Sequence, residues 1–291
     1  MADVHIEAAN AKINLALHVT GRRADGYHTL QSMVVFAELA DELQAIPAAA
    51  DRLSVQGPFA AGLGPSRSNL VMKAVAGFRQ RWPDLCPRGL DVRLTKNLPV
   101  MAGLGGGSAD AAATLRLLLA IAGVDVDRAE LNDLAVSLGA DVPACLLSRP
   151  CLVAGIGETV TPLRDFPASF VVLVNPMRPV VTADVFRRLD RHAFAPLPEL
   201  PESLDRTAML AMWLEDTRND LQSAALGLVP EIGDIEARLR RAPGCVFSRM
   251  SGSGATVFGL FGSGQLAHLA AQELRREWPD FWIAAAPLVA A

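Results

Sequence analysis

The sequence predicts an α+β protein of two domains, and three observations lead to this prediction. Residues 12–19 alternate apolar and polar side chains strictly, and with the turn signal that follows they indicate antiparallel β-structure over the first 46 residues. A glycine-rich loop at residues 102–107 then leads into a helix rich in alanine and leucine. At residues 170–174 the pattern starts again with a buried strand, FVVLV, and we place the domain boundary near residue 155. Since 291 residues suffice for two average domains, we expect one over residues 1–155 and another over residues 156–291.

The first predicted strand, residues 12–19, has one apolar and one polar face. Its sequence KINLALHV alternates strictly, and the polar face carries Lys12 and Asn14. The turn signal Asp25-Gly26 joins this strand to the segment TLQSMVVFAELADELQAI, which is predicted as further β-structure. The N-terminal part of the chain is therefore expected to form antiparallel β-structure.

Helices and one more strand follow in the predicted first domain. Ser68 or Asn69 can cap the first helix, because both side chains accept hydrogen bonds from free backbone amides. The stretch GLDVRLTKNLP alternates again and predicts a strand that ends at Pro99. Beyond the glycine loop, a helix is expected from about Ser108 to near Gly123.

A third helix and the second domain complete the prediction. Asp127 can cap the third helix, which ends at Gly139. After the strand FVVLV we expect a helix from Thr182, a proline-rich linker, APLPELPES, and three helical segments. The stretch CVFSRMSGSGATVFGLF predicts two strands around a glycine turn, and a helix and a final strand, FWIAAAP, end the chain.

Composition excludes several classes of protein. The formal net charge is −4 and the basic residues are scattered, which argues against a nucleic-acid partner. The apolar runs are shorter than the roughly 18 residues of a membrane span, and the N-terminus lacks the pattern of a secretory signal. We therefore expect no membrane partner. The four cysteines show no C-x-x-C spacing, so we expect reduced thiols, no structural zinc and a cytoplasmic protein.

The glycine loop has two interpretations. Glycines ahead of a helix let backbone amides approach phosphate oxygens closely, so residues 103–108 are a candidate anion site. Equally, the glycines can serve a tight turn and the alanines close helix packing. A P-loop is excluded because no basic residue follows until Arg116. The dinucleotide fingerprint also fails, since Ser108 occupies its third glycine position and a helix replaces the second parallel strand.

The pattern P-x3-G-L-G-x2-S-A, with an alanine-rich helix after it, resembles the phosphate loop of the GHMP kinase superfamily. Within that superfamily, AKINLALHVTGRRADGYHTL at residues 11–30 resembles the N-terminal signature of the 4-diphosphocytidyl-2-C-methyl-D-erythritol kinases. GLGGGSADAA, LGADVP, RNDL and SGSGA follow in the order of that family. The resemblance implies a two-domain GHMP kinase fold, with an N-terminal domain like domain 2 of ribosomal protein S5 and a ferredoxin-like C-terminal domain.

The resemblance also implies an activity. Such an enzyme transfers the γ-phosphoryl group of ATP, with Mg²⁺, to the 2-hydroxyl of 4-diphosphocytidyl-2-C-methyl-D-erythritol, a step of non-mevalonate isoprenoid biosynthesis. The partner is then a small molecule with a cytidine diphosphate group, bound with ATP between the domains by a monomer or weak homodimer. Met101 and Ala109 depart from the family's usual glycine and serine, which leaves Ser108 as the loop's one side-chain oxygen for phosphate or magnesium.

Two residues are implied as catalytic by the resemblance, and both have simpler interpretations. Asp141 would accept the proton of the substrate's alcohol, and Lys12 would keep that carboxylate ionised. From the sequence alone, Asp141 follows a glycine and precedes Pro143, as a helix N-cap does. Lys12 alone is equally a solvated strand residue or a member of a weak surface ion pair.

Further residues are implied to bind the substrates. Asn14 would hydrogen-bond the polyol, or else face water. Tyr27 and Phe186 would stack on the cytosine while His28 reads its polar edge, although Tyr27 also suits an exposed turn and Phe186 a core position. Thr182 would reach the diphosphate, or else cap its helix. The implied ATP-binding residues are Pro99, Gly103, Leu104, Gly105, Gly106, Gly107, Ser108, Ser251, Gly252, Ser253 and Gly254; the last four also suit a plain β-turn.

Three other functions remain open at this point. Another GHMP kinase would act on homoserine or a mevalonate derivative, and a panel of substrates distinguishes it. A nucleotide-binding sensor without turnover would share the fold, but the presence of both Lys12 and Asp141 argues against it. A Rossmann oxidoreductase is disfavoured by the glycine loop and would require nicotinamide binding.

Overall fold

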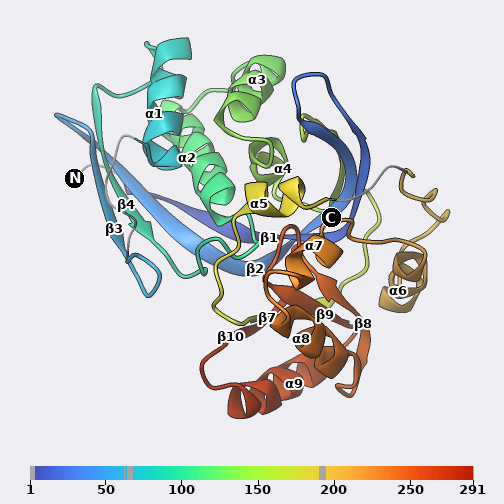
Figure 1. Cartoon of the computed structure of the whole chain (residues 1–291). Coiled ribbons are helices and arrows are strands. Elements are labelled where there is room, and N and C mark those ends of the chain that lie inside the picture. Colours follow the sequence, from blue (N-terminus) through green and yellow to red (C-terminus); the bar gives the residue numbers. More distant parts are fainter. Residues whose placement is uncertain (1–3, 62, 64–67, 190–194, 291) are drawn as a thin grey trace. The chain divides into compact units, whose positions relative to one another are not determined.

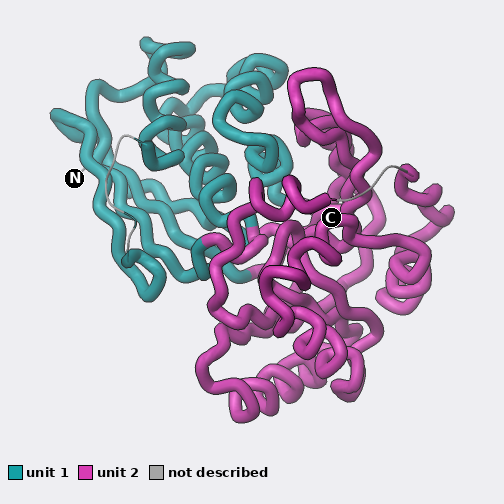
Figure 2. The backbone as a smooth tube through the Cα atoms, viewed as in Figure 1, with its two compact units in different colours: residues 1–11, 39–100, 105–148 teal, residues 12–38, 101–104, 149–291 magenta. Residues whose placement is uncertain are grey.

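The computed structural model describes residues 4–61, 63, 68–189 and 195–290 (Figure 1). Figure 2 shows two compact units, each built from several segments of the chain. Unit 1 comprises residues 1–11, 39–100 and 105–148, and unit 2 comprises residues 12–38, 101–104 and 149–291. These units are not the two continuous domains predicted on either side of residue 155, and that domain boundary stays a prediction.

Strands of a mixed sheet contribute to both units. Two long strands, β1 (His5–Arg22) and β2 (His28–Ala48), pair with each other and pass from one unit into the other along the chain. In unit 1, β2 pairs antiparallel with β4 (Gly89–Thr95), which pairs parallel with β3 (Arg52–Gln56). In unit 2, β2 pairs antiparallel with β5 (Cys151–Gly155), and β5 with β6 (Thr159–Pro162). The predicted N-terminal β-structure is confirmed.

The helices of unit 1 begin and end mainly where the capping residues predict. They are α1 (Leu70–Arg81), α2 (Gly106–Ala122), α3 (Arg128–Leu138) and α4 (Val142–Leu147). The side chains of Asn69 and Asp127 accept capping hydrogen bonds from α1 and α3, and Gly123 ends α2 in a left-handed conformation. The predicted start of α2 at about Ser108 is wrong by two residues, because Gly105 takes φ +63 and the next two glycines are already helical.

Unit 2 contains a second, antiparallel sheet in the order β10-β7-β9-β8. Its strands are β7 (Phe170–Asn175), β8 (Cys245–Met250), β9 (Val257–Phe261) and β10 (Trp282–Pro287). The helices are α5 (Thr182–Arg187), α6 (Thr207–Glu215), α7 (Gln222–Leu226), α8 (Glu231–Arg240) and α9 (Gly264–Glu277). Helices α8 and α9 pack on this sheet, and their apolar side chains share one core with its strands. The two sheets and nine described helices confirm the predicted α+β class.

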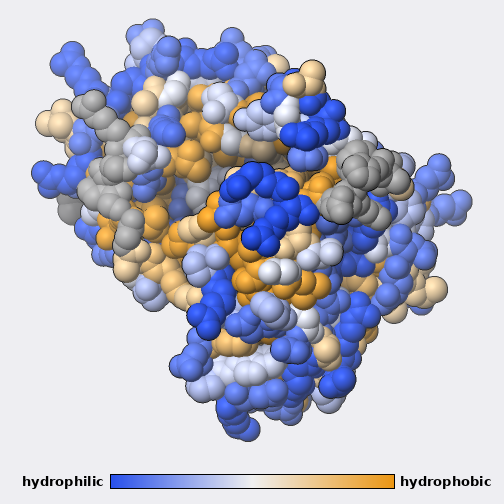
Figure 3. Space-filling view, in the orientation of Figure 1, coloured by the Kyte–Doolittle hydropathy of each residue, from blue (hydrophilic) through white to orange (hydrophobic). Residues whose placement is uncertain are grey.

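The four cysteines are free thiols, as the sequence predicts. In the view of Figure 3, hydrophilic residues are spread widely over the surface among smaller hydrophobic areas. No helix in the described part of the chain is both long and apolar enough to cross a membrane.

Candidate active site

The polar face of β1 is buried in unit 2. Lys12 and Asn14 are each 4% exposed, and the Lys12 ammonium donates a hydrogen bond to Asn14 Oδ1 at 2.9 Å. The Asn14 amide donates to Ser32 Oγ at 2.7 Å, and Ser32 Oγ donates to the carbonyl of Ala16 at 2.6 Å. The interpretation of Lys12 and Asn14 as solvated strand residues is therefore wrong. Burying a cation and an amide is costly unless they have hydrogen-bond partners, and this network supplies hydrogen-bond partners to both.

The same strand holds both glycine segments within unit 2. The backbone N–H of Lys12 donates to the carbonyl of Leu104 at 3.0 Å, and that of Asn14 donates to Ser251 Oγ at 3.1 Å. Ser251 Oγ in turn donates to the carbonyl of Gly103 at 3.0 Å. Five of the residues implied by the family, 239 positions apart at their extremes (12 to 251), thus meet at one place.

At position 103 a side chain would clash with the second glycine segment. A Cβ there would lie 2.6 Å from the carbonyl oxygen of Ser251 and 2.9 Å from that of Gly254, and the backbone has φ +75. The close packing of two backbone segments, one of the two interpretations of the loop, therefore holds at this glycine.

The second glycine turn, residues 251–254, lies between β8 and β9 and is closed by a hydrogen bond from Gly254 N–H to the Ser251 carbonyl at 3.0 Å. The Asn219 amide donates to the Gly252 carbonyl at 2.8 Å, which fixes the direction of that peptide. Among the described residues, the N–H groups of Gly252 and Ser253 have no hydrogen-bond acceptor. Two unpaired amides in a turn with left-handed glycines are suited to an anion.

Thr182 belongs to the same region of unit 2. Its hydroxyl lies 2.9 Å from the hydroxyl of Ser253, so helix α5 begins beside the second glycine turn. The N-cap of α5 is Val181, and Thr182 is its first helical residue. The interpretation of Thr182 as a capping residue is therefore wrong.

In unit 1, the N-terminus of α2 has the features of an anion site. The left-handed Gly105 supplies no side-chain cap, and the first turn carries no acidic residue. The first amides of a helix lack intrahelical acceptors and lie at the positive end of its dipole. Ser108, half-buried in this turn, offers the one hydroxyl, and Pro99 lies buried where the chain enters the loop.

Asp141 occupies the N-cap position of α4 in unit 1 but does not act as a cap. Its backbone is αR, with φ −86 and ψ −13, and its carboxylate makes no capping hydrogen bond. The predicted N-cap position of Asp141 is therefore confirmed, but its side chain does not stabilise the helix start by capping. The role of Asp141 as a base stays a prediction.

The tip of the β1–β2 hairpin carries the aromatic residues of unit 2. Tyr27 is 64% exposed, as an aromatic side chain in a turn can be. The His28 ring stacks on Phe186, with ring centroids 5.2 Å apart and planes inclined by 26°. Burial, and secondarily the charge of Arg22, lowers the pKa of His28, which favours the neutral ring with one donor and one acceptor nitrogen.

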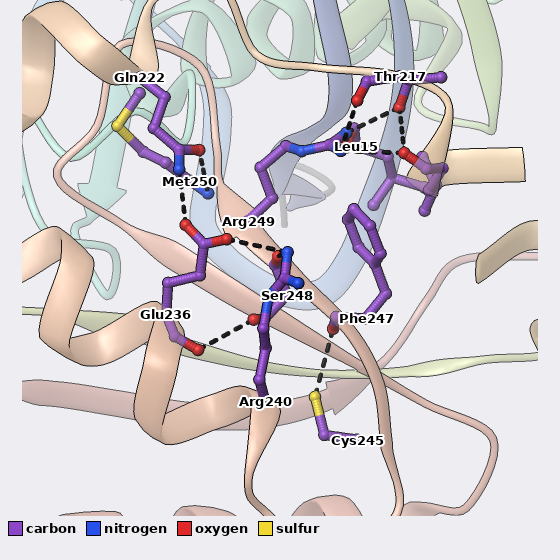
Figure 4. Close-up of polar contacts among 11 residues, drawn as sticks. Leu15, Thr217, Gln222, Glu236, Arg240, Cys245, Phe247, Ser248, Arg249 and Met250 are labelled. Carbon is purple, nitrogen blue, oxygen red and sulfur yellow. Dashed lines mark hydrogen bonds and ion pairs between the residues drawn. The ribbon is translucent and has the colours of Figure 1, made fainter. Parts of the chain in front are cut away.

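Arg249 is a residue that the sequence does not single out (Figure 4). Its buried guanidinium donates to the carbonyls of Leu15 at 3.1 Å and Leu214 at 2.9 Å, and to the carbonyl and hydroxyl of Thr217, both at 2.8 Å. It also lies over the Phe247 ring, 4.5 Å from the centroid. Burial lowers the pKa of Arg249 to about 10. Arg249 thereby joins β1, next to Asn14, to the strand that leads into the second glycine turn.

The RNDL segment lies against β1. The N–H of Leu17 donates to the carbonyl of Arg218, and that of Asp220 donates back to the carbonyl of Leu17, both at 2.9 Å. The Asp220 carboxylate accepts from the N–H of Val19 at 2.7 Å. Since Asn219 binds the glycine turn, this segment links the turn to the strand that carries Lys12.

Comparisons with known proteins agree with the family resemblance. The family model for the GHMP kinases N terminal domain matches residues 69–149, and that for GHMP kinases C terminal matches residues 201–280. The 4-diphosphocytidyl-2-C-methyl-D-erythritol kinase of Mesorhizobium japonicum is 49% identical over 277 residues, covering 95% of this chain and 93% of that protein. The enzyme of the same name from Rhizobium etli is 46% identical over 283 residues, covering 97% and 94%.

Solved structures give the same result. A crystal structure of 4-(cytidine 5'-diphospho)-2C-methyl-D-erythritol kinase has 35% sequence identity and a TM-score of 0.78, covering 99% of this chain and 100% of that chain. A homoserine kinase from Cytophaga hutchinsonii shares the fold, with 17% identity and a TM-score of 0.73 over 99% and 98% of the two chains. With relatives at 46 and 49% identity over nearly its whole length, the chain belongs to the GHMP kinases and, within them, to the family of 4-diphosphocytidyl-2-C-methyl-D-erythritol kinases.

Proposed function

We propose that this chain transfers the γ-phosphoryl group of ATP to the 2-hydroxyl of 4-diphosphocytidyl-2-C-methyl-D-erythritol. One observation carries the proposal beyond the family name. In unit 2 the buried Lys12–Asn14 pair is hydrogen-bonded through its backbone to both glycine segments, at Leu104 and Ser251. A cation and a polyol-binding amide are thus tied to the backbone that would hold phosphate, which is the arrangement that phosphoryl transfer needs.

Backbone amides would bind the phosphates of ATP. The N-terminal turn of α2, residues 106–108, carries no acidic residue of its own, and the first amides of a helix lack intrahelical acceptors. The unpaired amides of Gly252 and Ser253 would contact the phosphate groups from the second turn. Positioning by fixed dipoles suits a reaction in which the protein mainly orients the reactants and neutralises charge.

Asp141 would take the proton from the attacking hydroxyl, and Lys12 would stabilise the negative charge that develops there. The proposal for Asp141 is supported by the LGADVP motif. Asn14 would orient the substrate's polyol, because its amide lies on the same face of β1 as Lys12.

The loop offers one side-chain ligand for magnesium. Among the described residues, no group of three acidic, histidine or cysteine side chains is placed to hold a metal. Magnesium bound to nucleotides takes several of its ligands from phosphate and water, and Ser108, the one hydroxyl of the loop, would be its protein ligand there. When bound, Mg²⁺ supplies neutralisation of the phosphate charge.

The cytidine end of the substrate would bind at the hairpin tip. Tyr27, exposed in unit 2, and Phe186 would stack on the cytosine. His28, whose ring stacks on that of Phe186, would read the polar edge of the base. Thr182 would contact the diphosphate beside Ser253. We further propose that the enzyme acts in the cytoplasm as a monomer or weak homodimer.

The first experiment measures ADP release by the purified protein with ATP and Mg²⁺. We expect release with 4-diphosphocytidyl-2-C-methyl-D-erythritol and none with homoserine or mevalonate. Release with homoserine or mevalonate instead would retain the fold and the phosphate loop and refute the cytidine site. No release with any of the three would favour the sensor without turnover.

The change Asp141→Asn tests the proposed base. We expect turnover to fall by at least about 100-fold, because an amide cannot accept the proton, while ATP affinity changes less than about twofold. Asp127→Asn, at a surface helix cap of unit 1, is the control for a carboxylate-to-amide change. Turnover of Asp141→Asn equal to that of the control would refute the assignment.

A further inference from the structure

A buried cluster of charged side chains lies beside the start of α2 in unit 1. The Lys96 ammonium contacts Asp110 Oδ2 at 2.8 Å and also forms an ion pair with Asp41. The three residues are 3%, 5% and 0% exposed, respectively. We call them the Lys96 cluster. Asp110 lies within the motif GLGGGSADAA, but the sequence predicts no role for it, for Lys96 or for Asp41.

The Lys96 cluster joins the two ends of the glycine loop. On the side where the chain enters the loop, Asp41 Oδ1 accepts hydrogen bonds from the backbone N–H groups of Asn97 at 2.6 Å and Leu98 at 2.9 Å. On the side where the chain leaves it, Asp110 lies one helical turn after Gly106, the first residue of α2. Both ends belong to unit 1. The cluster therefore links the two ends of a glycine-rich segment.

Gly106, at the start of α2, lies close to the cluster. A Cβ built there would lie 3.5 Å from the Lys96 ammonium and 3.6 Å from Asp41 Oδ2. The cluster thus borders the first helical residue of α2.

Asp110 costs stability in its present surroundings. Among the residues that the structure describes, its buried Oδ1 has no hydrogen-bond partner, and the cluster contains two carboxylates but one cation. Buried charges without a full set of partners destabilise a fold. Burial raises the pKa of Asp110 to about 7, against the opposing effect of Lys96. A residue that costs stability and is nevertheless placed at a loop end is better explained by the loop than by the fold.

We propose that Asp110, acting through Lys96 and Asp41, is a positioning residue that holds the two ends of the segment 99–105 at the spacing required for binding the phosphates of ATP. The inference rests on the proposed function for its link to ATP. The ordering of the loop itself does not depend on that function. A loop whose ends are fixed pays less entropy when it binds its ligand.

The test compares the wild type with Asp110→Ala, which leaves the one-to-one pair of Lys96 and Asp41. Hydrogen–deuterium exchange of a peptide covering residues 99–108 should become about tenfold faster without nucleotide. The KM for ATP should rise about tenfold, while kcat and the KM for the alcohol substrate stay within about twofold. The urea midpoint should stay equal or rise, because the unpartnered carboxylate is gone.

Two further variants separate positioning from general structural damage. Asp110→Asn retains an oxygen for the Lys96 ammonium and should restore most of the loop's protection from exchange. Glu7→Gln is the matched control, because Glu7 pairs at 2.8 Å with Arg116 on the same helix but far along it from the loop. It should leave both the exchange of residues 99–108 and the KM for ATP unchanged.

Either of two results would overturn the inference. One is loop exchange in Asp110→Ala equal to that of the wild type. The other is faster exchange throughout unit 1 with a lower urea midpoint, which would assign Asp110 to the fold. Faster loop exchange with an unchanged KM for ATP would refute the link to ATP and so count against the phosphate site of the proposed function.

Discussion

His18 shows how one buried side chain joins segments that are distant in sequence. It lies on the polar face of β1, 1% exposed, and its Nδ1 is 2.9 Å from the carbonyl oxygen of Pro196 and 3.2 Å from that of Ala195. Its Nε2 accepts the backbone N–H of Arg218 at 3.0 Å. Nδ1 must therefore carry the proton and Nε2 must be free, so the neutral ring is required. His18 holds the proline-rich segment against β1 only in this state.

This arrangement makes stability depend on pH. Burial, followed by the charge of Arg218, lowers the pKa of His18 below its ordinary 6.5, although Asp220 opposes the shift. Since the folded-state pKa is the lower one, the stabilisation is present above pH 6.5 and is lost as the pH falls through the folded pKa. We expect the wild type to lose up to about 1.4 kcal/mol per pH unit there. His18→Gln keeps a donor and an acceptor but does not titrate, so its loss should be smaller.

Urea unfolding from pH 8 to pH 5 measures the difference between the two proteins. His28, whose pKa is also lowered, is present in both and cancels from the comparison. Parallel stability curves for the wild type and His18→Gln would show that His18 does not titrate with unfolding.

At the scale of elements, the two glycine segments of unit 2 depend on each other's shape. Gly103→Ala introduces a Cβ 2.6 Å from the Ser251 carbonyl oxygen at a backbone with φ +75. We expect a loss of stability of about 2–4 kcal/mol, from backbone strain and from displacement of the second turn, with a large loss of turnover. Thermal and urea unfolding, together with ADP release, check this expectation.

Gly123→Ala is the control for Gly103→Ala. Gly123 has φ +66 at the end of α2, and a Cβ there would meet nothing within 4 Å. It should therefore cost only the conformational strain, about 1 kcal/mol, and leave turnover intact. Equal losses in the two variants would mean that the contact between the glycine segments has no energetic role.

The sequence predicts most elements because their signals are local. Alternation identifies β1, the Asp25-Gly26 turn signal places β2 after it, and the side chains of Asn69 and Asp127 fix the starts of α1 and α3. The start of α2 is misjudged because glycine has a low helix propensity, and only the left-handed Gly105 shows where the helix begins. Local patterns carry no information on contacts such as Ser251 with Asn14, which depend on the whole of unit 2.

At the scale of the whole molecule, the family motifs locate most of the candidate site, whereas the buried charges beyond those motifs are not predicted. Charged residues usually lie at the surface, so Arg249 and Lys96 have no local mark of burial. One weak signal existed: the chain has three lysines, and two of them, Lys12 and Lys96, are buried. In an arginine-rich sequence, a retained lysine is worth examining for a role that arginine cannot fill.

Two buried groups, Asp110 and His18, affect how the stability of the whole molecule responds to pH. The pKa of Asp110 in the folded state, about 7, lies above its ordinary 3.8 because of burial. Its contribution to stability is therefore fully present below pH 3.8 and is lost as the pH rises to about 7. On acidification Asp110 increases the stability and His18 decreases it, so the effect of each group partly cancels that of the other.

Replacing Asp110 by asparagine should separate the two effects. At pH 8 we expect Asp110→Asn to be about 1 kcal/mol more stable than the wild type, because the excess buried charge facing Lys96 and Asp41 is removed. This advantage should shrink as the pH falls toward 4, where Asp110 of the wild type becomes protonated, so the variant should lose stability more steeply on acidification. Urea midpoints of both proteins at pH 8, 6.5 and 5 measure this difference. An advantage independent of pH would mean that Asp110 does not titrate with unfolding, and the gain at pH 8 would then reflect packing.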